Sequence, residues 1–328
     1  MNPRSPEATE ARARAFLSEL LMAVPLARGQ GDKAARLAAL ERAALFTPVF
    51  AGWPSPVDAW LDEARTLAHE RGEPATLTRL ALREAVLLMR RRDFDRALAA
   101  LDRLETGDRE PGPVERCWLL ATRARIQVRQ QAFDAAQATL EPLAGPRVDG
   151  WTGWLPQIAR AELQVERGEL ALAAASLRTV LLGLPHEMVE ERIQALQSLG
   201  FVLIVQVQPR AAREQLEMAK CLLRAAGIWS EVIQMELAVG SLHAACGDAA
   251  SAQACFGSAA DLCERYPQPE LEPLLGLGSA RAGGPGTGRG SSRCGAGSGE
   301  TLCAAGERDR LRQHDRLHFR AASGCRPP

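Results

Sequence analysis

RRDFDRALAALDRL, at residues 91–104, joins a short polar turn to a stretch in which small and large apolar residues recur at helical intervals. If the turn is placed at Phe94, the pattern returns at Phe133, Leu170, Pro209 and Ala249, in steps of 39, 37, 39 and 40 residues. An internal repeat of this length is typical of arrays in which each copy is one supersecondary unit. The clearest other copies are QQAFDAAQATLEPL (130–143), ERGELALAAASLRTVL (166–181) and CGDAASAQACFGSAADL (246–262).

Small residues occupy two fixed positions in every copy, nine residues before the turn and three residues after it. Two antiparallel helices approach closely only where their side chains are small, and larger residues further along the second helix then fill the groove to the next pair. The repeat therefore predicts pairs of helices. The small positions are Ala85, Ala124, Ala161, Gly200 and Gly240 before the turns and Ala97, Ala136, Ala173, Ala212 and Ala252 after them; the larger residues are Leu101, Leu140, Leu177, Leu216 and Phe256.

These motifs resemble those of tetratricopeptide repeat (TPR) proteins over about residues 32–275. The copy VQPRAAREQLEMA (207–219) departs from the family, because proline replaces the usual aromatic residue at the turn. The period exceeds the roughly 34 residues of the plain repeat and is closer to that of TPR regions in large bacterial regulators of the MalT-like kind. The resemblance implies an all-α, right-handed superhelix of about six antiparallel helix pairs that binds other proteins.

Two boundaries divide the chain. Residues 1–31 are expected to hold an N-terminal capping helix (6–24), and residues 32–275 the solenoid, whose degenerate first copy ends at Gly72. In residues 276–328, Gly, Arg and Ser replace Leu and Glu, so this tail is expected to be disordered. A frameshifted reading is the alternative, since 271–282 begins another first helix before the pattern stops, and 38 arginines against two lysines indicate a GC-rich gene.

The overall composition is that of a soluble helical protein. Hydrophobic residues make up 46% and aromatic residues 5%, and the formal net charge is zero, so no global field would recruit nucleic acid or an anionic membrane. The N-terminus lacks the order of a signal peptide, and no stretch approaches roughly 18 apolar residues. The chain is therefore expected to be cytoplasmic, with its eight cysteines acting as small buried hydrophobes.

No phosphate-binding loop, dinucleotide fingerprint, zinc-protease motif or nucleophile elbow occurs in the sequence, which argues against an enzyme and against a cofactor. His243, Cys246, Cys255 and Cys263 could form a metal site, but their spacing does not supply the close ligand pairs that zinc sites use. Buried thiols are the favoured interpretation. The neighbouring acids Glu190 and Glu191 are interpreted as the solvated start of a helix.

The candidate interaction site is the concave groove lined by the first helices. A basic first half would favour an acidic peptide or a terminal carboxylate, because arginine offers forked hydrogen bonds. The alternative is that these arginines are merely solvated helix surface. Counting in helical steps from the small residues predicts a basic half with Arg83, Arg90, Arg125 and Arg129, an acidic middle with Glu162 and Glu166, and an apolar end with Phe201 and Val205.

Two functions remain open from the sequence. The first is a protein-interaction scaffold or adaptor, as the sensory or assembly region of a bacterial signalling or transcriptional regulator. The second is a solenoid that senses a small molecule without catalysing a reaction. Neither nucleic acid nor a membrane is an expected partner. Four tryptophans near the starts of first helices are expected to pack between helix pairs: Trp118, Trp151, Trp154 and Trp229.

Overall fold

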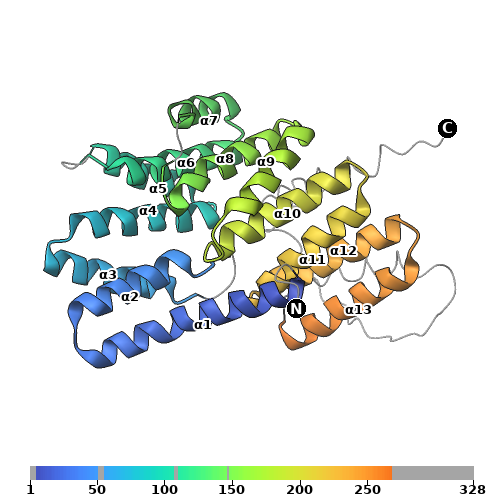
Figure 1. The fold of residues 1–328 in the computed structure, drawn as a ribbon, viewed down its shortest axis with the longest axis horizontal. Helices are drawn as coiled ribbons and strands as arrows, with labels where there is room; N and C mark the ends of the chain where they lie inside the picture. The colour runs from blue at the N-terminus through green and yellow to red at the C-terminus, as the bar shows by residue number, and fades with distance from the viewer. Residues whose placement is uncertain (1–4, 51–54, 107–109, 146–147, 268–328) are drawn as a thin grey trace, which may run out of the picture.

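The computed structural model describes residues 5–50, 55–106, 110–145 and 148–267. Within these ranges the chain forms thirteen α-helices, two short 3-10 helices and no strand, so the prediction of an all-α fold is confirmed (Figure 1). The helices are α1 (Pro6–Gln30), α2 (Lys33–Phe46), α3 (Val57–Arg71), α4 (Pro74–Arg90), α5 (Phe94–Thr106), α6 (Pro113–Arg129), α7 (Phe133–Leu140), η1 (Glu141–Leu143), η2 (Trp151–Trp154), α8 (Leu155–Glu166), α9 (Leu170–Gly183), α10 (Val189–Val205), α11 (Pro209–Ala225), α12 (Trp229–Ala245) and α13 (Ala249–Arg265).

Six helix pairs follow α1 in the described ranges, as the repeat predicted: α2 with α3, and so on to α12 with α13. Each anchor residue of the repeat is the first residue of the second helix in its pair. Each pair also packs on the next, so the pairs form a curved array in which neighbours share one face (Figure 1). The array is the solenoid architecture that stacked helical repeats produce.

The five turns within the later pairs share one backbone motif, in which the residue two before the anchor is left-handed. At the end of α10, for example, Val207 N–H donates to the Ile204 carbonyl (3.0 Å) and Gln208 N–H to the Leu203 carbonyl (2.9 Å). This is the Schellman arrangement, which satisfies the last carbonyls of a helix and reverses the chain. The left-handed residues are Arg92, Gln131, Gly168, Val207 and Gly247.

Small residues set the spacing within the pairs. All five alanines that follow the turns are fully buried, with no measurable exposure. At Gly200 an added Cβ would lie 2.5 Å from Leu216 Cδ2, and at Gly240 it would lie 2.8 Å from Phe256 Cε1. A larger residue at these positions would force the paired helices apart, which is the steric reason for the repeat.

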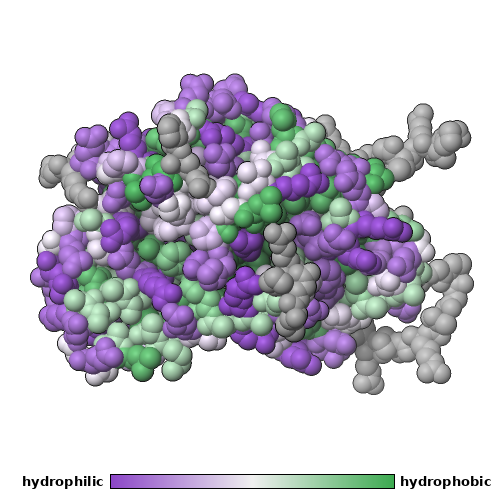
Figure 2. Space-filling view, viewed as in Figure 1, coloured by the Kyte–Doolittle hydropathy of each residue, from purple (hydrophilic) through white to green (hydrophobic). Residues whose placement is uncertain are grey.

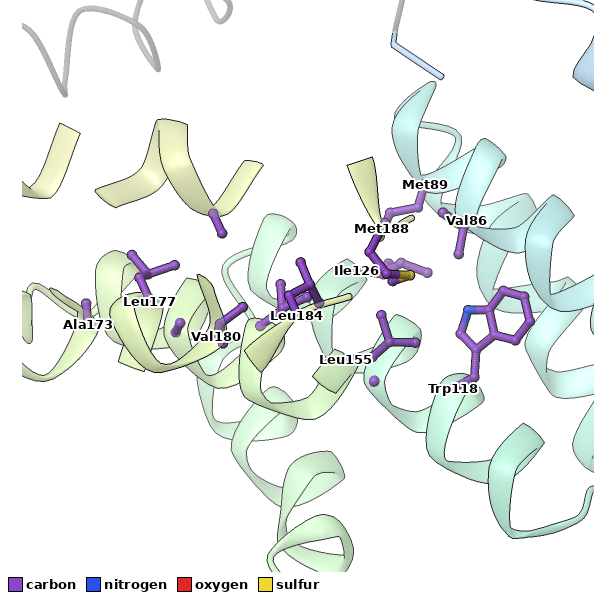
Figure 3. Packing of buried hydrophobic residues seen from close by; sticks show 14 of the residues in the cluster. Val86, Met89, Trp118, Ile126, Leu155, Ala173, Leu177, Val180, Leu184 and Met188 are labelled. Carbon is purple, nitrogen blue, oxygen red and sulfur yellow. The ribbon is translucent and has the colours of Figure 1, made fainter. Parts of the chain in front are cut away.

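Several clusters of buried apolar residues run through the pairs, and one of them extends from Leu82 of α4 to Ala212 of α11. Figure 3 shows its central part, where Val86 and Met89 of α4 and Trp118 of α6 approach Leu155 and Met188. These residues come from four different repeats, because Leu155 is the first residue of α8 and Met188 directly precedes α10. The inside of the array is therefore packed by side chains rather than left as an open channel. Figure 2 shows hydrophilic and hydrophobic residues interspersed over one outer face of the described residues.

The first helix extends beyond the predicted 6–24 and ends at Gly31, whose φ of 71° is left-handed. It also contacts more than the first pair, because it packs along both α2 and α11 (Figure 1). Its buried residues Phe16, Leu17 and Leu20 belong to the core of α10, α11 and α12, whereas Val24 belongs to the core of α2 and α3. A cap would touch its nearest neighbour only, so α1 joins distant parts of the array.

The predictions for 271–282 and for the tail 276–328 lie outside the described residues, as does the frameshifted reading. Among the helices that the structure describes, none is long and apolar enough to cross a bilayer.

Candidate functional site

The inner face of the array is built by the first helices α4, α6, α8 and α10. Four of the residues that the sequence places on the groove are the last residues of these helices: Arg90, Arg129, Glu166 and Val205. We call the three exposed members of this row, Arg129, Glu166 and Val205, the rim. Arg125, Glu162 and Phe201 lie one helical turn earlier in α6, α8 and α10, and Arg83 lies two turns before the end of α4. The repeat thus aligns chemically different side chains at equivalent positions.

Glu190 is the centre of a buried ion-pair network. Its carboxylate accepts hydrogen bonds from Arg83 Nη2 (3.1 Å) and Arg90 Nε (2.8 Å) of α4, and from the Val49 N–H (3.1 Å). The three charged side chains expose only 4%, 7% and 4% of their surface for Arg83, Arg90 and Glu190. Burial raises the pKa of Glu190, but the two arginines outweigh it, and the pKa lies below its ordinary value.

The segment that follows α2 lies inside this network. Arg83 donates from Nε to the Ala44 carbonyl (2.9 Å) and from Nη2 to the Thr47 carbonyl (2.8 Å). Val49 is buried beside them. The inside of the array is therefore occupied by the protein's own chain, held through both main-chain and side-chain hydrogen bonds.

Arg125 forms a second centre of the network. It pairs with Glu162 of α8 (Nη2 to Oε1, 2.7 Å) and donates to Gln194 Oε1 of α10 (2.7 Å). Burial raises the pKa of Glu162, but Arg125 and Arg129 lower it further, to about 2. Burial also lowers the pKa of Arg90 to about 10. The charge of Glu190 opposes this shift, and the charges of Arg125 and Arg129 add to it. The protonation of each of these groups therefore depends on the charges of the others.

These contacts correct two expectations. Arg83, Arg90 and Arg125 form neither an open basic groove nor solvated helix surface, because they are buried and paired with Glu190 or Glu162. Glu190 is not a solvated helix start either, because it is buried within α10's first turn. The physical reason is the curvature of the array, which brings the start of α10 against α4 and α6.

The remaining groove residues lie at the surface or close to it. Arg129 and Glu166 are exposed, and no ion pair joins Arg129 to another described residue. Val205 exposes 40% of its surface, and Phe201 is half-buried against the core of α10 to α12. The structure thus places Arg83, Arg90 and Arg125 inside the array and leaves Arg129 and Val205 accessible on the rim.

One small cavity lies beside the network, between α4, α6 and the start of α10. Arg83, Arg125, Glu191, Trp118 and Trp151 are among its lining residues, and it encloses about 10 Å³. That is room for a single water molecule. The cavity is therefore far smaller than the pockets of roughly 300–1,000 Å³ that hold small-molecule ligands.

The cysteine and tryptophan predictions have mixed outcomes. Cys117 and Cys221 are buried, but Cys246 is exposed, so burial does not hold for every cysteine. His243 Nδ1 lies 3.1 Å from Asp248 Oδ2, and no three metal-ligating side chains gather in the part of the chain that the structure describes. Trp118 and Trp151 pack edge to face, with ring centroids 4.9 Å apart, as residues between helix pairs are expected to do.

Comparison with known proteins gives one structural likeness. The chain is similar to the crystal structure of a tetratricopeptide repeat protein from Parabacteroides merdae, with 15% sequence identity and a TM-score of 0.44. The match covers 81% of this chain and 99% of that one. No protein-family model and no curated protein matches the chain. The helix-pair architecture stands on the contacts described above.

Proposed function

We propose that the protein is a protein-interaction scaffold whose partner binds along the rim. The observation that carries the proposal is the alignment of Arg129, Glu166 and Val205 at equivalent, exposed helix ends of successive pairs. A stacked array presents such positions at regular spacing, and an extended partner segment can contact several of them in turn.

The rim is a better candidate than the inside of the array, because the inside is filled. Arg83, Arg90 and Arg125 have intramolecular partners, and an incoming carboxylate would have to displace a buried one. Replacing one buried ion pair by another returns little free energy. Arg129 has no such competitor at ion-pair distance among the described residues. Glu166 is the nearest acid on the rim, and burial and the charge of Glu162 raise its pKa although Arg129 opposes them.

The partner that we propose is a protein segment that carries acidic and apolar side chains. An acidic group would pair with Arg129, and an apolar group would cover Val205. The long TPR-like period favours a bacterial signalling or transcriptional regulator as the setting, with this chain as its assembly or sensory region. A small-molecule ligand is the weaker alternative, since the cavity inside the array holds only one water.

The test compares two exposed arginines by affinity purification and quantitative mass spectrometry from the source cell. Arg129→Glu lies on the rim, and Arg178→Glu lies in the middle of α9 away from it; both positions are exposed, so both variants should fold. We expect Arg129→Glu to lose partners that Arg178→Glu retains, and the lost partners to bind less at high salt. Equal sets of partners for the wild type and both variants would contradict the proposal.

A further inference from the structure

Val207 occupies an unfavourable backbone conformation in the turn between α10 and α11. Its φ is 58°, in the left-handed region, where a β-branched residue is a steric outlier. The equivalent residues in two other turns are Gly168 and Gly247, which adopt positive φ without a Cβ clash. The turn needs the left-handed conformation because both Schellman hydrogen bonds depend on it.

Packing does not explain why valine stands there. Val207 exposes 78% of its surface, and the neighbouring Val205 exposes 40%. A strained residue that is also buried could be held by its contacts, but an exposed apolar one gains nothing from the fold. Arg92 and Gln131 adopt the same conformation in two other turns, but neither is β-branched. Strained residues cluster at sites where the side chain serves a ligand.

The surroundings of the two valines are basic. Arg210 and Arg213 on the adjoining first turns of α11 are exposed, and neither forms an ion pair with another described residue. The first turn of α11 contains no acidic residue, and one exposed acid, Glu214, follows Arg213 in the second turn. This stretch of the chain therefore carries two exposed apolar side chains and, three and six residues after Val207, two exposed guanidinium groups, a combination that complements an apolar side chain flanked by a carboxylate.

We infer that Val205 and Val207 form the apolar anchor of a docking site for a protein segment in which a bulky apolar side chain stands beside an aspartate or glutamate. The inference rests on the proposed scaffold function and names the part of the rim, and the partner chemistry, that supply most of the affinity. Val207 is then a residue kept for binding at the expense of stability.

The test pans a displayed library of random 12-residue peptides against the full chain. We expect enriched peptides to combine a bulky apolar residue with Asp or Glu, and to bind Val207→Gly and Val207→Asn about tenfold more weakly than the wild type. Both substitutions relieve the left-handed strain, so both variants should also melt at a higher temperature.

Gln131→Gly is the matched control, because it relieves the same strain (φ 63°) in the turn between α6 and α7. It should melt higher than the wild type and bind the enriched peptides equally well. Peptides that bind Val207→Gly as tightly as the wild type, or a library that yields no acidic-apolar motif, would overturn the inference. If Arg129→Glu loses cellular partners while Val207→Gly retains them, the scaffold function stands without this anchor; if neither variant loses a partner, both proposals fail.

Discussion

Gly200 and Gly240 lie where the first helix of a pair comes closest to the second. Glycine in a helix interior ordinarily costs about 0.5–1 kcal/mol relative to alanine, so its presence at these two positions needs a reason. The reason is the 2.5 Å and 2.8 Å approaches that a Cβ would make to Leu216 and Phe256. The close packing of the paired helices at these two positions outweighs the low helix propensity of glycine.

Gly200→Ala should therefore destabilise the protein by about 1–3 kcal/mol, because the added methyl group overpacks the contact with Leu216. Gly257→Ala is the matched control in α13, where nothing lies within 4 Å of the added Cβ, and it should stabilise by about 0.5–1 kcal/mol. Urea unfolding measures both. Changes of the same sign at the two positions would mean that the paired helices are not spaced as described.

The type of residue alone predicts the local structure at some positions and not at others. The alanines after the turns could be predicted, since a small side chain that recurs at one repeat position has a steric cause. Val207 could not be assigned to a left-handed turn, because valine disfavours that conformation. Only the hydrogen bonds at the end of α10 show that the turn motif prevails over the preference of the residue.

Two arginines one helical turn apart in α6 have opposite surroundings. Arg125 exposes 3% of its side chain and pairs with Glu162, whereas Arg129 is exposed. Arg125→Glu should cost several kcal/mol, because it places two carboxylates together in a buried site. Arg129→Glu should stay within about 0.5 kcal/mol. Thermal or urea unfolding of the two variants decides this, and similar losses for both would place Arg125 at the surface.

The ion pair between Glu162 and Arg125 also predicts that part of the free energy of unfolding is lost in acid. The pKa of this carboxyl is about 2 in the folded chain against an ordinary 4.5, so its contribution is complete above about pH 4.5 and is lost as the pH falls toward 2. The shift corresponds to about 3 kcal/mol. Glu162→Gln should thus be less stable than the wild type at pH 7, and the difference should shrink between pH 4.5 and 2. A difference that does not change with pH would contradict the pairing.

The ion pairs differ in how far the sequence could predict them. Arg125 and Glu162 are 37 residues apart, which is one repeat period, so neighbouring first helices could have been paired from the pattern. Arg83 and Glu190 are 107 residues apart, across three repeats. Their contact depends on how tightly the array curves, and the small residues that space each pair do not encode that curvature.

At the scale of the molecule, α1 ties distant pairs together. Leu20 exposes 1% of its surface and belongs to the core of α10 to α12, while the next residue, Leu21, exposes 48%. Leu20→Asp should loosen α1 and raise hydrogen exchange in α2 and α10 to α12 together, with little effect in α6 and α7. Leu21→Asp should leave the exchange pattern unchanged. Hydrogen exchange that rises in α2 alone would show that α1 only caps the first pair.

The closed inside of the array rests on the contact between α4 and α10. A double-mutant cycle with Arg83→Met and Glu190→Gln measures it directly by urea unfolding. Each single variant leaves a buried partner unpaired and should cost about 3–5 kcal/mol, whereas the double variant should cost well below the sum, with a coupling energy above about 1 kcal/mol. Additive costs, within about 0.5 kcal/mol, would show that the two side chains do not meet and that the inside of the array is open.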